Sequence, residues 1–179
     1  MKSIAKILFI SAVCLLFVPQ QTGAEEVKGK SLIEKVCQGT NAKDLCTAIL
    51  LSDPRSLQET ENGLAMIALN VASKNATDII NHVKVLDGDD SLDPNVEQAL
   101  NDCQDTFEDA QDQITDAIGS LVAGNTKDAQ KWLQAGLAAS DTCENSLRGN
   151  EHILLNKTET FRKLCSIALS IIQNLPSSK

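Results

Sequence analysis

The sequence predicts an all-α protein: an antiparallel four-helix bundle preceded by an N-terminal helical hairpin and stapled by disulfides. Aromatic residues make up only 3% of the 179 residues and Tyr is absent, whereas strands favour aromatic and β-branched side chains. Apolar residues recur at spacings of three and four, the helical period, and Gly or Pro punctuates these segments. A chain of this length is enough for one domain with a substantial core.

Residues 1–24 have the pattern of a secretory signal peptide. A basic start precedes an apolar run at 7–18, and Thr22-Gly23-Ala24 supplies small residues at the cleavage position. The run is shorter than the ~20 residues that a membrane span needs, although a retained anchor is the alternative. We therefore expect a secreted, extracellular protein whose single domain is residues 25–179.

Cleavage of residues 1–24 leaves an acidic chain. That segment holds two lysines and no acid, so 14 Lys and Arg residues remain against 24 Asp and Glu residues, a formal net charge of −10. An acidic chain without a basic patch is a poor nucleic-acid binder. The charge suits a basic partner, and it fits a merely solvated surface equally well.

Cysteines and sequons carry more information in a secreted chain, where disulfides are the default. Five cysteines follow the signal segment, and their odd number leaves one thiol free or paired between molecules. They are Cys37, Cys46, Cys103, Cys143 and Cys165. Asn75 and Asn156 each begin an Asn-x-Thr sequon, so we expect them to be candidate glycosylation sites.

Two short helices are predicted at 29–39 and 42–52. Cys37 and Cys46 bracket the turn between them, so a local bridge can close this hairpin. The segment Asp53-Pro54-Arg55-Ser56 then interrupts the chain, because Pro ends a helical pattern.

The first long helix is predicted from about Leu57 to Leu86, with apolar residues at helical spacing. The acidic loop 87–91 lacks the spaced ligands and distal Glu of an EF-hand, so we expect a solvated loop and no metal site. Asp93 and Pro94 supply an N-cap and a first helical residue for the second long helix, to about Val122.

A third helix opens at Gly124-Asn125 and runs to about Leu147, and a final helix runs from about Lys157 to Leu175. The inner face of the third helix is small, which allows close approach to its neighbours. That face consists of Ala129, Leu133, Gly136, Ser140, Cys143 and Leu147.

A second bridge is geometrically feasible. Cys103 lies 21 residues before Gly124 and Cys143 lies 19 residues after it, which is about 31 and 28 Å from the turn at a rise of 1.5 Å per residue. If the two helices are antiparallel neighbours, the thiols are level on their apolar faces. A bridge there leaves Cys165 as the odd residue, expected to be a buried, inert thiol.

The sequence offers little for catalysis. It has two histidines, His82 and His152, and it lacks the HExxH, GxSxG, phosphate-loop and CxxC motifs. We therefore expect a protein that is not an enzyme and that has no catalytic residues, metal or cofactor.

One arrangement stands out on the second long helix. Five carboxylates follow one another at spacings of three and four, so they share one face, opposite Cys103 and Phe107. These residues, here called the acidic row, are Asp102, Asp105, Asp109, Asp112 and Asp116. A solvated face and a docking surface for a basic or hydrogen-bond-donating cleft are both consistent with this pattern.

Several motifs together resemble the plant pectin methylesterase/invertase inhibitor family, over nearly all of residues 25–179. They are the Cys37/Cys46 hairpin, Ser52-Asp53-Pro54-Arg55-Ser56, the Cys103 to Asp109-Ala110 helix and Thr142-Cys143-Glu144. The resemblance implies an N-terminal hairpin, a four-helix bundle and bridges 37–46 and 103–143. It also implies inhibition of an enzyme by a protein that catalyses nothing itself.

The family has two classes of target. The Gly-x-Pro-Lys-Phe segment of the invertase inhibitors falls on Gly124-Asn125-Thr126-Lys127-Asp128, which keeps only Lys127 of the Pro-Lys-Phe triplet. The pectinesterase branch instead covers the pectin-binding cleft of its target, and the unpaired Cys165 resembles that branch. Its contact positions fall on Asp105, Asp109, Asp112 and Thr142, and on Asn145, which replaces an acidic residue.

The resemblance therefore implies a secreted inhibitor of pectin methylesterase in the apoplast or cell wall, a monomer that binds its target one to one and reversibly. Inhibition of a cell-wall or vacuolar invertase is the alternative. A bundle that carries an apolar ligand, or an allergen-like protein without inhibitory activity, is a further one. We expect neither nucleic acid nor membrane as a partner.

Overall fold

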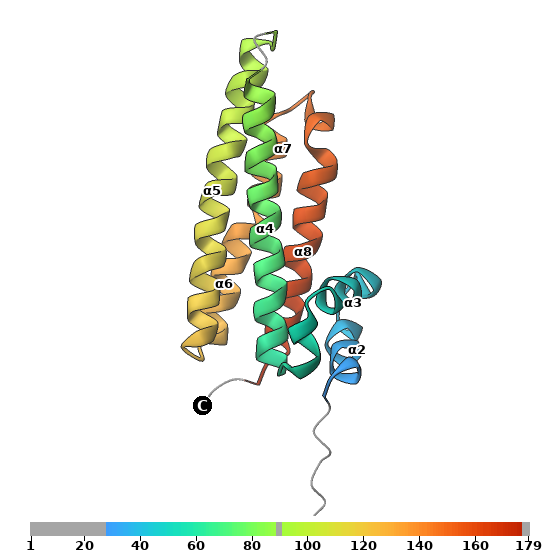
Figure 1. Cartoon of the computed structure of the whole chain (residues 1–179). Coiled ribbons are helices and arrows are strands. Elements are labelled where there is room, and N and C mark those ends of the chain that lie inside the picture. Colours follow the sequence, from blue (N-terminus) through green and yellow to red (C-terminus); the bar gives the residue numbers. More distant parts are fainter. Residues whose placement is uncertain (1–27, 89–90, 177–179) are drawn as a thin grey trace, which may run out of the picture.

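The computed structural model describes residues 28–88 and 91–176, and every regular element within them is helical. Figure 1 shows the long helical segments side by side, with a short helical hairpin beside one end of the bundle. The all-α architecture predicted from the sequence is confirmed. The expected signal peptide, residues 1–24, lies outside the described residues.

The N-terminal hairpin consists of α2 (Lys30–Gln38) and α3 (Lys43–Leu51). The Cys37–Cys46 disulfide joins the two helices across their turn, with Cα atoms 5.6 Å apart. A bridge therefore closes the hairpin, and both cysteines are fully buried.

The first long helix, α4 (Glu61–Asp87), begins four residues later than predicted. Residues Pro54–Gln58 form a 3₁₀ helix, η1, which Asp53 caps by accepting a hydrogen bond from the Arg55 N–H at 2.9 Å. Thr60 is extended and accepts a hydrogen bond from the Gly63 N–H at 3.2 Å, so it is the N-cap of α4. These two caps place Leu57 outside the helix.

The second long helix, α5 (Pro94–Val122), has the predicted bounds. Asp93 accepts a hydrogen bond from the Asn95 N–H at 2.8 Å, and Pro94 occupies the first helical position, where no N–H is needed. The buried side chains of the helix recur at helical spacing from Ala99 to Leu121.

The third helix is not continuous, contrary to the prediction. It consists of α6 (Thr126–Leu137) and α7 (Ala139–Ser146), which meet at a tight turn at Ala138. The Ala138 N–H bonds the Ala135 carbonyl at 3.2 Å, an i→i−3 bond that tightens the last turn of α6. A short 3₁₀ segment, η2 (Glu151–Ile153), then leads into α8 (Leu155–Gln173), which begins and ends two residues earlier than predicted.

The four long segments form a closed ring around one core. Helices α4 and α6 each pack against both α5 and α8, and α7 continues the contacts of α6 with α5 and α8. Phe107 of α5 and Phe161 of α8 are fully buried and meet edge to face, with ring centroids 5.1 Å apart. The centre of the bundle is therefore filled by side chains from diagonally opposite helices.

Candidate functional site

The acidic row lies entirely on the exposed side of α5. Asp102 accepts a hydrogen bond from Gln98 at 2.9 Å. Within the described residues, the carboxylates of the other four members make no hydrogen bond or ion pair. They are Asp105, Asp109, Asp112 and Asp116. The row therefore presents carboxylates whose charge the fold itself does not neutralise.

Thr142 and Asn145, the predicted contact positions on the third helix, are exposed on α7. The Thr142 hydroxyl donates a hydrogen bond to the Ala138 carbonyl at 3.1 Å, at the turn between α6 and α7. The turn and this hydrogen bond fix the orientation of the Thr142 side chain.

A groove of about 280 Å³ runs between α5 and the α6–α7 turn. Its walls are polar on α5 and mostly methyl groups on the other side. The lining residues are Thr106, Asp109, Ala110 and Gln113 from α5, and Ala135, Ala138, Ala139 and Thr142 from α6 and α7. The structure therefore brings Asp109 and Thr142 to one groove.

Two close contacts fix the register of α5 against α6 and α7. The Cys103–Cys143 disulfide holds its Cα atoms 4.6 Å apart. Gly136 approaches so closely that a Cβ there would lie 3.3 Å from the Ala110 carbonyl oxygen. Ala110 follows Cys103 by seven residues and Gly136 precedes Cys143 by seven, so both contacts belong to one antiparallel register.

This register spreads the predicted contact residues along the seam. Asp105 and Thr142 lie beside the disulfide, whereas Asp112 lies about two turns beyond Asp105 and Asn145 lies past the disulfide in the other direction. The candidate site is therefore an elongated surface over α5, α6 and α7 rather than a single cluster.

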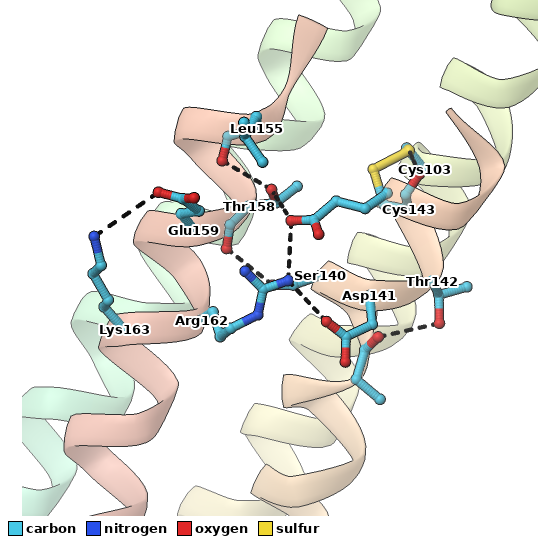
Figure 2. A network of polar contacts seen from close by, with 12 residues as sticks. Cys103, Ser140, Asp141, Thr142, Cys143, Leu155, Thr158, Glu159, Arg162 and Lys163 are labelled. Atoms are coloured by element: carbon cyan, nitrogen blue, oxygen red, sulfur yellow. Dashed lines mark hydrogen bonds and ion pairs between the residues drawn. A yellow bond between two sulfur atoms is a disulfide. The ribbon is translucent and has the colours of Figure 1, made fainter. Parts of the chain in front are cut away.

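A polar network holds α7 against α8 on the other side of α7 (Figure 2). The Arg162 guanidinium of α8 donates hydrogen bonds to Asp141 at 2.8 Å and to Glu144 at 3.0 Å. Glu144 also accepts a hydrogen bond from the Thr158 hydroxyl, and the buried Ser140 hydroxyl donates to the Thr158 carbonyl at 3.0 Å. These bonds fix the helix that carries Thr142 and Asn145.

Sequence reasoning missed this network. Its members lie 14 to 21 residues apart in the chain and have no diagnostic spacing. The sequence offers one weak signal, which is that Arg162 lies on the helix that follows the acidic residues Asp141 and Glu144. The groove was also missed, because it depends on how two helices meet.

Three further predicted sites are now located. Cys165 is a fully buried free thiol, and burial raises its pKa far above the ordinary value of a cysteine. Asn156 is exposed in the first turn of α8, whereas Asn75 lies in the middle of α4 with its buried Oδ1 atom unpaired. No group of His, Cys, Asp and Glu in the described residues is arranged to hold a metal ion.

The comparisons with known proteins agree with this architecture. The family model described as plant invertase/pectin methylesterase inhibitor matches residues 31–171. The chain belongs to this family. Its members are proteinaceous enzyme inhibitors, so the chain is not an enzyme.

Family members of both target classes resemble the chain. A pectinesterase inhibitor of Actinidia deliciosa is 28% identical over 96% of this chain and 95% of its own length. The cell wall/vacuolar inhibitor of fructosidase 2 of Arabidopsis thaliana is 24% identical over 96% of this chain and 98% of its own. The crystal structure of a mutant form of an Arabidopsis pectin methylesterase inhibitor superposes with a TM-score of 0.70 at 25% identity, over 82% of this chain and 98% of that one.

In the described part of the chain, no helix has the length and apolar character needed to cross a bilayer. The relatives' names divide between pectinesterase and invertase targets.

Proposed function

We propose that the protein is a secreted inhibitor of pectin methylesterase, which it blocks by covering the pectin-binding cleft in a reversible one-to-one complex. The observation that carries the proposal is the groove between α5 and the α6–α7 turn, which Asp109 and Thr142 both line and where both are exposed. Asp105, Asp112 and Asn145 extend this surface along the same seam.

The mechanism is steric occlusion by a preorganised surface. Two close contacts between α5 and the α6–α7 segment, and the Arg162 network behind α7, hold the seam before binding. A rigid surface loses little conformational entropy on association, which favours tight binding. The exposed carboxylates attract an enzyme whose cleft wall carries hydrogen-bond donors or basic side chains, and so they favour encounter in the right orientation.

The choice of pectin methylesterase over invertase rests on two observations. Lys127 is the only retained residue of the invertase-inhibitor triplet, and it lies exposed in the first turn of α6, at the α5–α6 turn rather than in the groove. The Actinidia relative, a pectinesterase inhibitor, has the higher identity of the two relatives described above. Invertase inhibition through the Lys127 region is the second candidate.

The carrier alternative has less support. Phe107 and Phe161 occupy the centre of the bundle, where an apolar ligand would have to lie. Secretion to the cell wall, with a glycan on the exposed Asn156, remains part of the proposal.

The decisive experiment titrates the oxidised protein, residues 25–179, against a plant pectin methylesterase and a cell-wall invertase in parallel at apoplastic pH. We expect loss of pectinesterase activity alone. Loss of invertase activity alone would favour the second candidate, and no effect on either enzyme would contradict both.

A charge reversal tests the surface itself. We expect Asp109→Lys to weaken pectinesterase inhibition at least tenfold, because it places a cation on the groove wall, and to leave the melting temperature nearly unchanged. Asp44→Lys, on the exposed face of α3, is the matched control and keeps full inhibition. Equal inhibition by both variants would remove the groove from the interface.

A further inference from the structure

Helix α7 carries two of the predicted contact residues, Thr142 and Asn145, and it is too short to be stable alone. It has eight residues, and within the described part of the chain no side chain caps its first N–H groups. Isolated helices of fewer than about 12 residues are marginal in water. The neighbouring helices α5 and α8 therefore determine the direction in which Thr142 and Asn145 point.

Successive side chains of α7 point to different neighbours. An α-helix turns by about 100° per residue, so Cys143 faces α5, to which its disulfide binds it, whereas Asp141 and Glu144 face α8 (Figure 2). Thr142 and Asn145 occupy the exposed arc between these two sides. A rotation of α7 about its own axis would turn that arc, and the disulfide and the contacts with α8 resist the rotation from opposite sides.

The contacts with α8 centre on the guanidinium of Arg162. Its Nη2 atom lies 2.8 Å from Oδ1 of Asp141 and 3.0 Å from Oε1 of Glu144. The two ion pairs differ in burial, because 73% of the Asp141 side chain is exposed and only 24% of the Glu144 side chain is. Water and salt weaken an exposed pair more than a sheltered one, so the pair with Glu144 is the firmer anchor.

Glu144 is held from a second direction by buried groups. The fully buried Thr158 hydroxyl donates a hydrogen bond to it, and the fully buried Ser140 hydroxyl donates to the Thr158 carbonyl at 3.0 Å. Loss of the Arg162 guanidinium would leave a largely buried carboxylate without its cation, which is unfavourable. The helix can relieve this cost by turning Glu144 toward water, and such a turn moves the two contact residues as well.

We infer that Arg162 is a positioning residue for the candidate site. Through Glu144 and Asp141 it fixes the rotation of α7, and thereby the direction of the two contact residues. Arg162 is not among the residues that line the groove, so it acts on binding through α7. This inference rests on the proposed function, since it assumes that the surface bearing Thr142 meets the enzyme.

Replacement of Arg162 tests its role in inhibition. We expect Arg162→Met, which keeps an unbranched side chain and removes the donors, to weaken inhibition of pectin methylesterase by about tenfold. Arg162→Lys should recover most of the inhibition, because one nitrogen of the guanidinium makes both ion pairs. The matched control is Lys163→Met, which removes the next cation of α8, paired with Glu159 of the same helix at 4.0 Å. It should inhibit like the wild type.

A double-mutant cycle with Thr142 separates positioning from a general loss of stability. If Arg162 directs Thr142, then Thr142→Ala weakens inhibition less in the Arg162→Met background than in the wild type. Additive losses would overturn the inference. Asp141→Asn/Glu144→Gln removes the same ion pairs from the side of α7 and should act like Arg162→Met, and it replaces that variant if melting shows that Arg162→Met does not fold.

Hydrogen exchange of the free protein tests the anchor without any enzyme. We expect the backbone amides of α7 to exchange about tenfold faster in Arg162→Met than in the wild type, and at the wild-type rate in Lys163→Met. Unchanged protection of α7 in Arg162→Met overturns the inference, whatever the enzyme assay gives. Faster exchange in α7, together with a wild-type protein that does not inhibit, rejects the proposed function and keeps Arg162 as the residue that orients α7.

Discussion

Asp53 and Arg55 form an exposed ion pair in the segment that joins the hairpin to the bundle. The Arg55 guanidinium donates to both Asp53 oxygens, at 3.0 Å from Nε to Oδ1 and 2.6 Å from Nη2 to Oδ2. These hydrogen bonds, followed by the one from the Arg55 N–H, lower the pKa of Asp53 from 3.8 to about 2. The folded state therefore holds the Asp53 proton more weakly than the unfolded state does.

This difference predicts a pH dependence at the residue scale. The stabilisation by Asp53 is complete above its unfolded pKa, and it is lost as pH falls from about 4 through about 2. We expect Arg55→Gln to raise the pKa of Asp53 toward 3.8, measured by NMR titration of the carboxyl carbon, and to remove this acid sensitivity. A pKa that stays near 2 in the variant would assign the shift to the backbone hydrogen bond instead.

Two glycines test the helix contacts at the scale of the element. A Cβ at Gly136 would meet the Ala110 carbonyl oxygen at 3.3 Å, whereas a Cβ at Gly119 would meet nothing within 4 Å. We expect Gly119→Ala to stabilise the protein by about 0.5–1 kcal/mol through helix propensity. Gly136→Ala gains the same propensity, but overpacking costs about 1–3 kcal/mol, so we expect net destabilisation of about 1 kcal/mol.

Chemical denaturation of both variants measures this difference. Stabilisation by Gly136→Ala similar to that by Gly119→Ala would mean that α5 and α6 have room to separate.

The helices themselves show which signals in the sequence are local. The start of α5 was predicted because Asp93 and Pro94 suffice to define it. The predicted start of α4 was wrong by four residues, because the apolar pattern extends back to Leu57. The caps at Asp53 and Thr60 instead separate a 3₁₀ helix, which contains Leu57, from α4. The break at Ala138 left no signal, since alanine is the best helix former. We attribute it to packing of α6 and α7 against α5.

The two disulfides make a prediction for the whole molecule. Cys103 and Cys143 enclose a 40-residue separation, and Cys37 and Cys46 a separation of nine. Loop-closure entropy assigns about 4 kcal/mol to the first bridge and about 3 kcal/mol to the second. We therefore expect Cys103→Ala/Cys143→Ala to lower the free energy of unfolding more than Cys37→Ala/Cys46→Ala does.

Inhibition should follow the same order, because the Cys103–Cys143 bridge joins α5 to α7, two of the helices that line the groove, whereas the Cys37–Cys46 bridge joins α2 to α3. Urea unfolding and pectinesterase inhibition of the two double variants check both points. Greater loss of inhibition on removing the hairpin bridge would move the interface to α2 and α3.

The candidate site was predictable only in part. Periodicity alone places Asp105, Asp109 and Asp112 on one exposed face, because a single helix determines that arrangement. The groove depends on the register between α5 and α6, and the Arg162 network depends on α7 meeting α8. Such contacts join residues far apart in the chain, so one sequence without structure does not reveal them.

The acidic row gives dissolved salt two opposite effects. In the free protein, neighbouring like charges at spacings of three and four repel one another along α5, and mobile ions relieve that repulsion. In the proposed complex, the same ions would compete with basic groups of the target for the carboxylates of the row. Higher ionic strength therefore stabilises the free inhibitor and weakens its affinity for a basic target. The ionic strength of the surrounding fluid would thus shift the balance between the free protein and the proposed complex.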